Sequence, residues 1–190
     1  MQSIYETELQ EKDELENDCI AFTGGGTGGH IYPGLAVIEE LRRLGFKGRI
    51  VWIGSEKELD RSIVTGQGIE YHAIPSGKFR RELSLRNISD LGRVASAYFR
   101  ARALLKDIGP SILFSKGGYV SVPPCWAASS LGIPVITHES DASPGLATRL
   151  NSKKASLILT SWEVTAQYFP ESLRTKIIRA GNPVRPDILN

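Results

Sequence analysis

Short apolar runs alternate with helix-length amphipathic segments along most of the chain. The runs lie at 19–23, 49–53, 70–74, 111–115, 134–137, 156–160 and 176–179, and helical patterns lie near 33–44, 57–67, 87–108, 121–131, 144–153 and 163–168. Short apolar strands that alternate with helices are typical of a mostly parallel sheet covered on both faces. The sequence therefore predicts a doubly wound, Rossmann-like α/β domain.

The most unusual loops follow the first, fourth and fifth predicted strands. They read TGGGTGGH (23–30), SKGGYVS (115–121) and THESDASPG (137–145). In such sheets ligands bind beyond the carboxyl ends of the strands, where the strand order reverses. With the common strand order 3-2-1-4-5 these three loops are neighbours, so we expect them to line one crevice.

The first loop is rich in glycine and leads into a helix. Glycines let backbone N–H groups approach a ligand closely, and a helix N-terminus attracts anions, which together favour a phosphate-bearing ligand. Gly24, Gly26 and Gly29 also satisfy G-x-G-x-x-G, but a dinucleotide site needs an acidic residue at the end of the second strand. That strand ends Ile53-Gly54-Ser55, which weakens the nicotinamide interpretation.

His30 stands where the first helix starts. The helix dipole opposes a positive imidazolium there, so the neutral ring is favoured, and a neutral ring is what a general base requires. The alternative is a structural role, in which His30 caps the helix or bonds a carbonyl group.

The second loop contains Lys116, Gly117, Gly118 and Tyr119. Its glycines are able to expose N–H groups to a second phosphate. A plain strand-to-helix turn with a surface lysine explains the same residues equally well.

The third loop contains His138, Glu139 and Asp141. Glu139, at a strand end, is placed to accept hydrogen bonds from a sugar. Asp141 or Ser143 is able to cap the helix that Pro144 starts, and His138 is interpreted as a buried, hydrogen-bonded ring.

Cys19 and Cys125 lie in apolar surroundings without metal-ligand spacing, so we expect reduced packing residues. The three scattered histidines do not indicate a metal site.

No apolar run approaches the ~18–20 residues of a membrane span, and residues 1–18 lack the apolar core of a signal peptide. We expect a cytosolic chain.

The net charge of +2 conceals an asymmetry. Residues 1–18 hold seven acidic residues and one lysine, which leaves 22 basic and 14 acidic residues, or +8, for the remainder. Segment 75–106 alone has eight basic and two acidic residues, interleaved with apolar ones. This pattern favours contact with anionic lipid, with a solvated basic face as the alternative; nucleic acid fits less well because no binding module accompanies the charge.

Five motifs in order resemble the N-terminal half of the MurG family of peptidoglycan N-acetylglucosaminyltransferases, which have the GT-B fold. They are GGGTGGHIYPGLA (24–36), SGKFRRELSLRN (76–87), FSKGGYVSVP (114–123), HESDASPGLA (138–147) and GNPVR (181–185). The resemblance implies inverting transfer of GlcNAc from UDP-GlcNAc to the MurNAc 4-hydroxyl of lipid I, giving lipid II, at the cytoplasmic face of the membrane. It implies no cofactor and no metal.

The resemblance also implies roles for individual residues. His30 matches the family's proposed base. The implied donor-binding residues are Thr27, Gly28, Gly29 and Arg185. The implied acceptor and diphosphate residues are Gly26, Lys116, Gly117, Gly118, Tyr119, Glu139 and Asp141. The implied membrane-docking residues are Lys78, Phe79, Arg80, Arg81, Leu83, Leu85, Arg86 and Ile88.

Two features depart from the family pattern. Many members have Asn at the position of Asp141, and a carboxylate has no donor with which to repeat an amide contact.

The sequence also stops just after GNPVR, so we expect an acidic extension (1–18), an acceptor-binding domain (19–180), the start of a linker (181–190) and an absent C-terminal donor domain. We expect such a chain to be inactive alone. The alternatives are a non-catalytic, membrane-docking subunit of a split glycosyltransferase and, on G-x-G-x-x-G alone, an NAD-dependent oxidoreductase.

Overall fold

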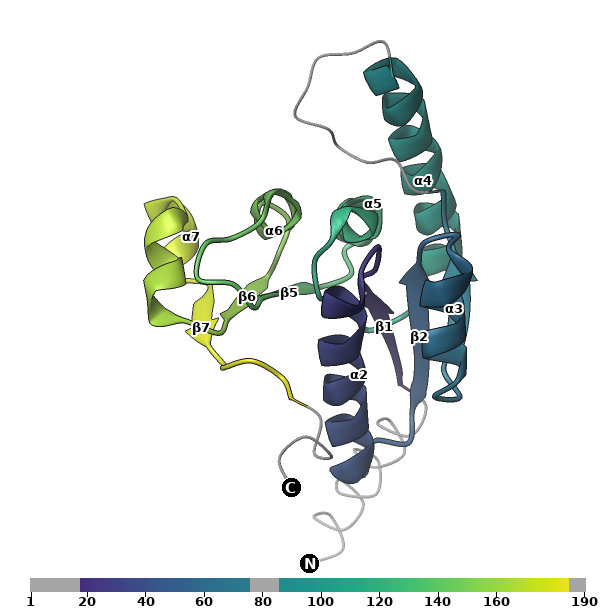
Figure 1. Ribbon diagram of the computed structural model, residues 1–190, viewed down its shortest axis with the longest axis horizontal. Helices are drawn as coiled ribbons and strands as arrows, with labels where there is room; N and C mark the ends of the chain where they lie inside the picture. The colour runs from purple at the N-terminus through teal and green to yellow at the C-terminus, as the bar shows by residue number, and fades with distance from the viewer. Residues whose placement is uncertain (1–17, 76–85, 185–190) are drawn as a thin grey trace, which may run out of the picture.

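The computed structural model describes residues 18–75 and 86–184, which form a seven-stranded, all-parallel sheet in the order β3-β2-β1-β4-β5-β6-β7 (Figure 1). The strands are β1 (Cys19–Thr23), β2 (Arg49–Gly54), β3 (Glu70–Ala73), β4 (Ile112–Ser115), β5 (Val135–Glu139), β6 (Leu157–Thr160) and β7 (Ile177–Arg179). The predicted fold class, strand positions and order of the first five strands are confirmed.

Helices cover both faces of this sheet. The helices are α2 (Gly28–Arg43), α3 (Glu58–Thr65), α4 (Arg86–Ile108), α5 (Val122–Ser130), α6 (Leu146–Ser152) and α7 (Glu171–Arg174), with 3-10 turns η1 (Tyr119–Ser121) and η2 (Glu163–Tyr168). Helix α2 packs against α3, whereas α5 packs against α4 and α6. In the part of the chain that the structure describes, no helix is both long and apolar enough to cross a membrane.

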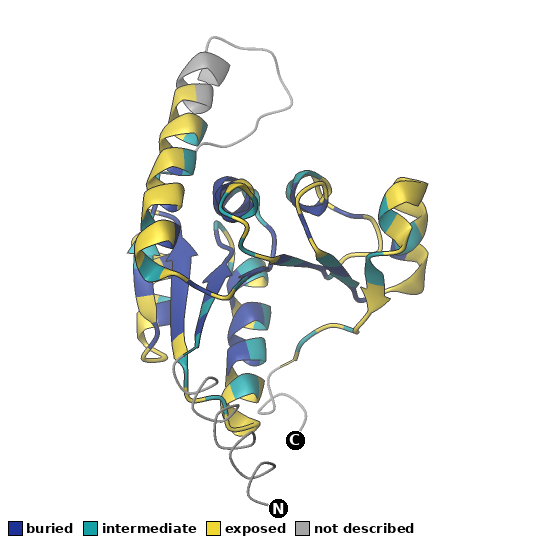
Figure 2. Cartoon of the chain, turned by 180° about the vertical axis from the view of Figure 1, so that it is seen from behind, coloured by how far each residue is buried: buried dark blue, intermediate teal, exposed yellow. Residues whose placement is uncertain are grey.

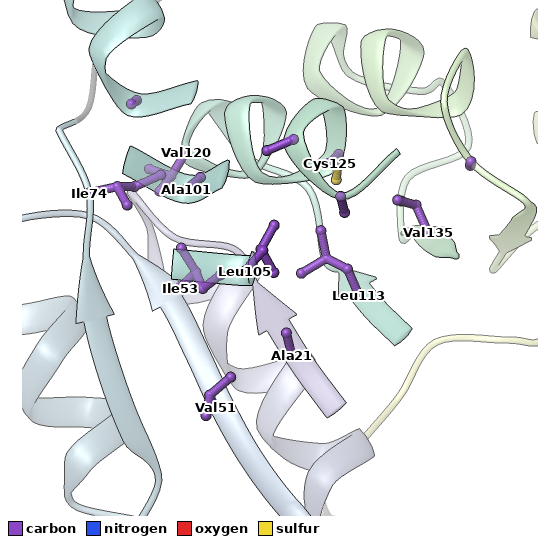
Figure 3. Close-up of a cluster of buried hydrophobic side chains, with 14 of the residues drawn as sticks. Ala21, Val51, Ile53, Ile74, Ala101, Leu105, Leu113, Val120, Cys125 and Val135 are labelled. Atoms are coloured by element: carbon purple, nitrogen blue, oxygen red, sulfur yellow. The ribbon is translucent and has the colours of Figure 1, made fainter. Parts of the chain in front are cut away.

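The core consists of two layers because successive strand residues point to opposite faces. On one face Ala21, Val51 and Leu113 pack against small residues of α4 and α5 such as Ala101 and Cys125 (Figure 3). On the other face Phe22, Trp52 and Phe114 pack under α2. The central strands are therefore buried on both sides, as Figure 2 shows, which explains their continuous apolar sequence.

Two expectations about local structure were wrong. The first helix begins at Gly28, which confirms the position of His30 at its start but lies ahead of the helical pattern near 33–44; Pro33 is inside the helix, at the cost of the hydrogen bond that its missing N–H would make. Segment 163–168 is a 3-10 turn and not an α-helix, and the four-residue α7 had no predicted counterpart.

Candidate functional site

The three unusual loops begin side by side at the carboxyl edge of the sheet. Thr23 of β1 is in register with Ser115 of β4, and Ser115 is in register with Thr137 of β5. The predicted convergence of the loops is therefore confirmed, and it occurs where the strand order reverses between β1 and β4.

A cavity of ≈ 300 Å³ lies between the second loop, the third loop and α6. Its lining includes five of the predicted residues: His30, Gly118, Tyr119, Glu139 and Asp141. The rest of the lining comes from Val122, Gly145, Leu146, Ala147, Thr148 and Leu150. Polar groups thus meet an apolar wall in one concave site, as is usual for a small-ligand pocket.

His30 reaches this cavity from the first turn of α2. Its Nδ1 lies 3.2 Å from the carbonyl oxygen of Lys116. Because a carbonyl oxygen only accepts hydrogen bonds, Nδ1 carries the proton of this contact, and Nε2 is the nitrogen that accepts a proton in this tautomer. The structural alternative for His30 predicted a hydrogen bond to a carbonyl group, and that bond is present. The same bond orients the ring as a general base requires.

Two glycines of the second loop adopt conformations that exclude most side chains. Gly117 has φ 82° and Gly118 has φ 77°. A Cβ atom on Gly118 would lie 2.9 Å from Cδ2 of His30 and 2.5 Å from the carbonyl oxygen of Gly25. Gly118 therefore lets the second loop pack directly against the His30 ring.

The glycine loop after β1 is held by a buried carboxylate that the sequence analysis missed. Asp60 of α3 is 2% exposed and accepts hydrogen bonds from the Gly26 N–H (2.8 Å) and the Ser55 hydroxyl (2.6 Å). The Lys57 ammonium donates to the Gly26 carbonyl (2.8 Å). The sequence contained a signal for this role. Asp60 lies four positions before the apolar Val64, so both residues lie on the buried face of the same short helix.

The hydrogen bonds with Asp60 and Lys57 change the interpretation of Gly26 as a diphosphate-binding residue. Its N–H donates to Asp60, so that group faces into the protein and not toward a ligand. The absence of a side chain serves packing, because a Cβ at Gly26 would lie 2.5 Å from Cε1 of Tyr119. Thr27, Gly28 and Gly29 stand at the N-terminus of α2, outside the lining of the cavity.

Lys116 is not the surface lysine or the phosphate ligand that the sequence suggested. Its side chain is 3% exposed, and its ammonium donates to Nδ1 of His138 and to the Ser140 hydroxyl, both at 2.6 Å. Burial lowers the pKa of Lys116 to about 8, although the nearby carboxylates Glu139 and Asp141 oppose that shift. The ammonium lies outside the lining of the cavity.

His138 is a buried, hydrogen-bonded ring, as expected. It is 2% exposed, and its Nε2 bonds the carbonyl oxygen of Gly181 at 2.8 Å. Burial, assisted by the Lys116 charge, lowers the pKa of His138 to about 4. The ring is therefore neutral at pH 7.

Glu139 shapes the third loop. One carboxylate oxygen accepts from the Asp141 N–H (2.9 Å) and the other from the Gly145 N–H (3.1 Å). The expected caps at Asp141 and Ser143 were wrong: α6 begins at Leu146, Gly145 is its N-cap residue, and no side chain caps it. Each Glu139 oxygen keeps a second lone pair for a ligand hydroxyl in the cavity.

The cysteines are confirmed as free and buried, and burial raises the pKa of the Cys125 thiol to about 12. Within residues 18–75 and 86–184, no group of three or more His, Cys, Asp or Glu side chains is able to hold a metal ion. The predicted docking residues from Lys78 to Leu85, and Arg185, lie outside the described residues. Arg86 and Ile88 belong to the first turn of α4, of which the structure describes only the backbone.

Comparison with known proteins identifies the family of this chain. Residues 20–160 match the model of the glycosyltransferase family 28 N-terminal domain. A Treponema denticola protein named UDP-N-acetylglucosamine–N-acetylmuramyl-(pentapeptide) pyrophosphoryl-undecaprenol N-acetylglucosamine transferase is 53% identical over 175 residues, which are 88% of this chain and 44% of that protein. The protein of the same name from Lachnospira eligens is 44% identical over 170 residues, 90% of this chain and 47% of that protein.

Solved structures show the same fold. The crystal structure of Acinetobacter baumannii MurG superimposes with a TM-score of 0.70 at 24% identity, over 91% of this chain and 47% of that one. UDP-N-acetylglucosamine 2-epimerase from Rickettsia bellii gives a TM-score of 0.62 at 14% identity, over 91% and 46%. The chain thus spans less than half the length of these relatives. By its family match and its identity to these transferases, the chain belongs to glycosyltransferase family 28, of which it contains the N-terminal domain.

Proposed function

We propose that this chain forms the acceptor-side half of an inverting glycosyltransferase that moves GlcNAc from UDP-GlcNAc to the MurNAc 4-hydroxyl of lipid I, giving lipid II. The observation that carries the proposal is His30, oriented by the Lys116 carbonyl and facing a cavity, in a chain 53% identical to a transferase of that name. UDP-GlcNAc is a substrate here, and the proposal includes no metal; transfer is therefore expected to continue in the presence of EDTA.

The proposed chemistry is a single displacement. Nε2 of His30 accepts the proton of the acceptor hydroxyl while that oxygen attacks the anomeric carbon of GlcNAc. The bond from the anomeric carbon to the diphosphate oxygen breaks, and UDP leaves with the bonding electrons. Attack opposite the leaving group inverts the anomeric carbon.

The proposed binding roles follow the position of each residue. Gly118, Tyr119, Glu139 and Asp141 line the cavity and are assigned to the acceptor. Gly117 lies beside them, in contact range of His30. The N-terminal amides of α2 at Gly28 and Gly29, with Thr27 and Arg185, are assigned to the donor phosphates, because a helix N-terminus favours anions. Gly26 and Lys116 are assigned to support of the site.

A chimera tests the proposal without requiring this chain to act alone. Residues 19–184 replace the matching N-terminal part of the T. denticola relative, and transfer from UDP-GlcNAc to a lipid I analogue is measured beside the intact relative. We expect a rate within about tenfold of the parent. A folded but inactive chimera beside an active parent contradicts the proposal.

His30→Ala in the same chimera separates catalysis from structure. We expect kcat to fall by ~10²–10⁴-fold, the usual contribution of a general base. His72→Ala is the matched control, since His72 on β3 pairs with Glu70 away from the cavity. A loss below tenfold for His30→Ala means that His30 serves the helix and not the reaction.

Localisation and membrane contact form part of the same proposal. Lipid-linked acceptor is reached at a membrane surface, and the interleaved basic and apolar residues of segment 78–88 suit the anionic cytoplasmic face of a bilayer. We propose a peripheral protein of that face, completed by a C-terminal donor-binding domain.

A further inference from the structure

Lys116 carries a positive charge into the interior although the cavity does not use it. The lysine stem passes between the glycine loop and α2, where glycines make room for it. A Cβ at Gly24 would lie 3.3 Å from the Lys116 Cβ, and a Cβ at Gly34 would lie 3.6 Å from its Cγ. Two chain segments thus leave a passage for this side chain, and the passage ends at His138 and Ser140.

Two hydrogen-bond chains leave the ammonium, and it sets the direction of both. An ammonium only donates, so Nδ1 of His138 accepts, and the other ring nitrogen carries the proton that bonds the Gly181 carbonyl (2.8 Å). The Ser140 hydroxyl likewise accepts from Lys116 and donates to Oδ1 of Asn182 (2.8 Å). Both chains therefore end on consecutive residues of one segment.

That segment, residues 180–184, is the stretch through which the chain leaves the sheet after β7 (Figure 1), and we call it the exit segment. It is largely exposed, and Gly181 turns there with φ 77°. At its start the Ala180 N–H donates a backbone hydrogen bond to the Thr160 carbonyl (2.9 Å). The two chains from Lys116 thus hold the segment beyond the point where sheet pairing ends.

The same residue holds His30 through its backbone. The Lys116 carbonyl bonds Nδ1 of His30, while the Lys116 ammonium is linked to the exit segment through His138 and Ser140. We propose that Lys116 is a positioning residue that holds the exit segment in a fixed place relative to the His30 loop. This inference rests on the proposed function only for its catalytic consequence; the anchoring itself is independent of it.

An NMR experiment on the ¹⁵N-labelled full chain tests the anchoring. In the unaltered protein we expect order parameters of ~0.85 for the Gly181 and Asn182 amides, the value of a rigid backbone. Lys116→Met keeps the length and the backbone carbonyl but removes the donor, and is expected to lower both values below ~0.6. Lys153→Met, at an exposed lysine after α6, is the matched control and leaves them unchanged.

Further variants keep the test decisive if Lys116→Met fails to fold. Ser140→Ala and Asn182→Ala each break one chain and should loosen Asn182 more than Gly181, whereas Asn182→Asp keeps the acceptor oxygen and should preserve order. Unchanged amide dynamics in Ser140→Ala and Asn182→Ala, or equal loosening in Lys153→Met, overturns the proposal.

The chimera then separates this proposal from the proposed function. There Lys116→Met should lower kcat/KM by about tenfold or more, and Asn182→Asp should retain activity. A rigid exit segment with normal kinetics in Lys116→Met refutes the positioning role. A chimera that is inactive without any substitution instead refutes the proposed function, and the NMR result alone then decides the anchoring.

Discussion

At the scale of single residues, the site depends on backbone geometry that only glycine permits beside the His30 ring. Gly118 and Gly132 share φ 77°, but their surroundings differ: a Cβ at Gly118 would meet Gly25 and His30, and a Cβ at Gly132 would meet nothing within 4 Å. Positive φ therefore disfavours an L-residue at both positions, whereas a methyl group would crowd the site only at Gly118, whose ψ of 152° also lies outside the left-handed helical region.

We expect Gly132→Ala to lower the free energy of unfolding by about 1–2 kcal/mol, the cost of a left-handed L-residue. Gly118→Ala should cost a further ~1–3 kcal/mol, because the methyl group overlaps the Gly25 carbonyl and pushes the His30 ring. Urea unfolding of both variants measures the difference. Equal losses would mean that the second loop moves aside without strain.

His138 makes stability depend on pH in a predictable direction. Its pKa is about 4 in the folded protein, against an ordinary value of 6.5, with Lys116 and Glu139 as the charged groups that act on it. Between these values the unfolded chain binds more protons than the folded one, so stability falls as pH drops from about 6.5 to about 4.

The slope from this one group is at most ~1.4 kcal/mol per pH unit. His138→Gln removes the titrating ring, so its stability curve should be flatter than that of the unaltered protein over that pH range. Chemical unfolding at several pH values gives both curves. Parallel curves show that His138 titrates alike in the folded and unfolded states.

At the scale of elements, the glycine loop after β1 takes its shape from α3. Asp60 is a second acidic residue in the first turn of that helix, beside Glu58, but only Asp60 is buried and accepts the Gly26 N–H and the Ser55 hydroxyl. A helix that contributes nothing to the cavity lining therefore fixes the loop that leads into His30.

Asp60→Ala leaves two polar groups without their acceptor, and we expect a loss of about 2–4 kcal/mol in the free energy of unfolding. Glu58→Ala removes an exposed acid from the same helical turn and should cost only ~0.3–1 kcal/mol. Hydrogen exchange at the Gly26 amide should accelerate in Asp60→Ala alone. Similar stability losses in the two variants would mean that Asp60 acts only through the helix dipole and not through its hydrogen bonds to the loop.

The elements themselves were predictable from the sequence because the signal is local. Apolar runs such as Val51–Ile53 are buried on both faces of the sheet, and such runs are visible in the sequence. Clusters of glycine at strand ends, which tight turns require, are visible there too. The use of Lys116 and Asp60 was not predictable, because their partners His138 and Gly26 lie 22 and 34 positions away and meet only in the folded chain. Pattern alone does not distinguish a lysine that reaches a ligand from one that supports the site.

At the scale of the whole molecule, charge is distributed so that the body of the protein is basic. Residues 19–190 hold 22 basic and 14 acidic residues, and the first 18 residues offset most of this excess. A basic body is attracted to an anionic bilayer, and the attraction weakens with ionic strength. If segment 78–88 is the contact, binding should depend on the position of the charges as well as on their total.

We therefore predict that the full chain co-sediments with vesicles containing phosphatidylglycerol, less with pure phosphatidylcholine, and less again as salt rises. Replacing Lys78, Arg80 and Arg81 with Glu should weaken partitioning by at least about 10²-fold, since each basic residue near the surface contributes ~1 kcal/mol. Lys153→Glu, Arg174→Glu and Arg179→Glu together change the net charge equally at exposed positions after α6, at the end of α7 and in β7. Comparable weakening by both triple variants would show that the protein responds to its total charge, and segment 78–88 would then have no special part in docking.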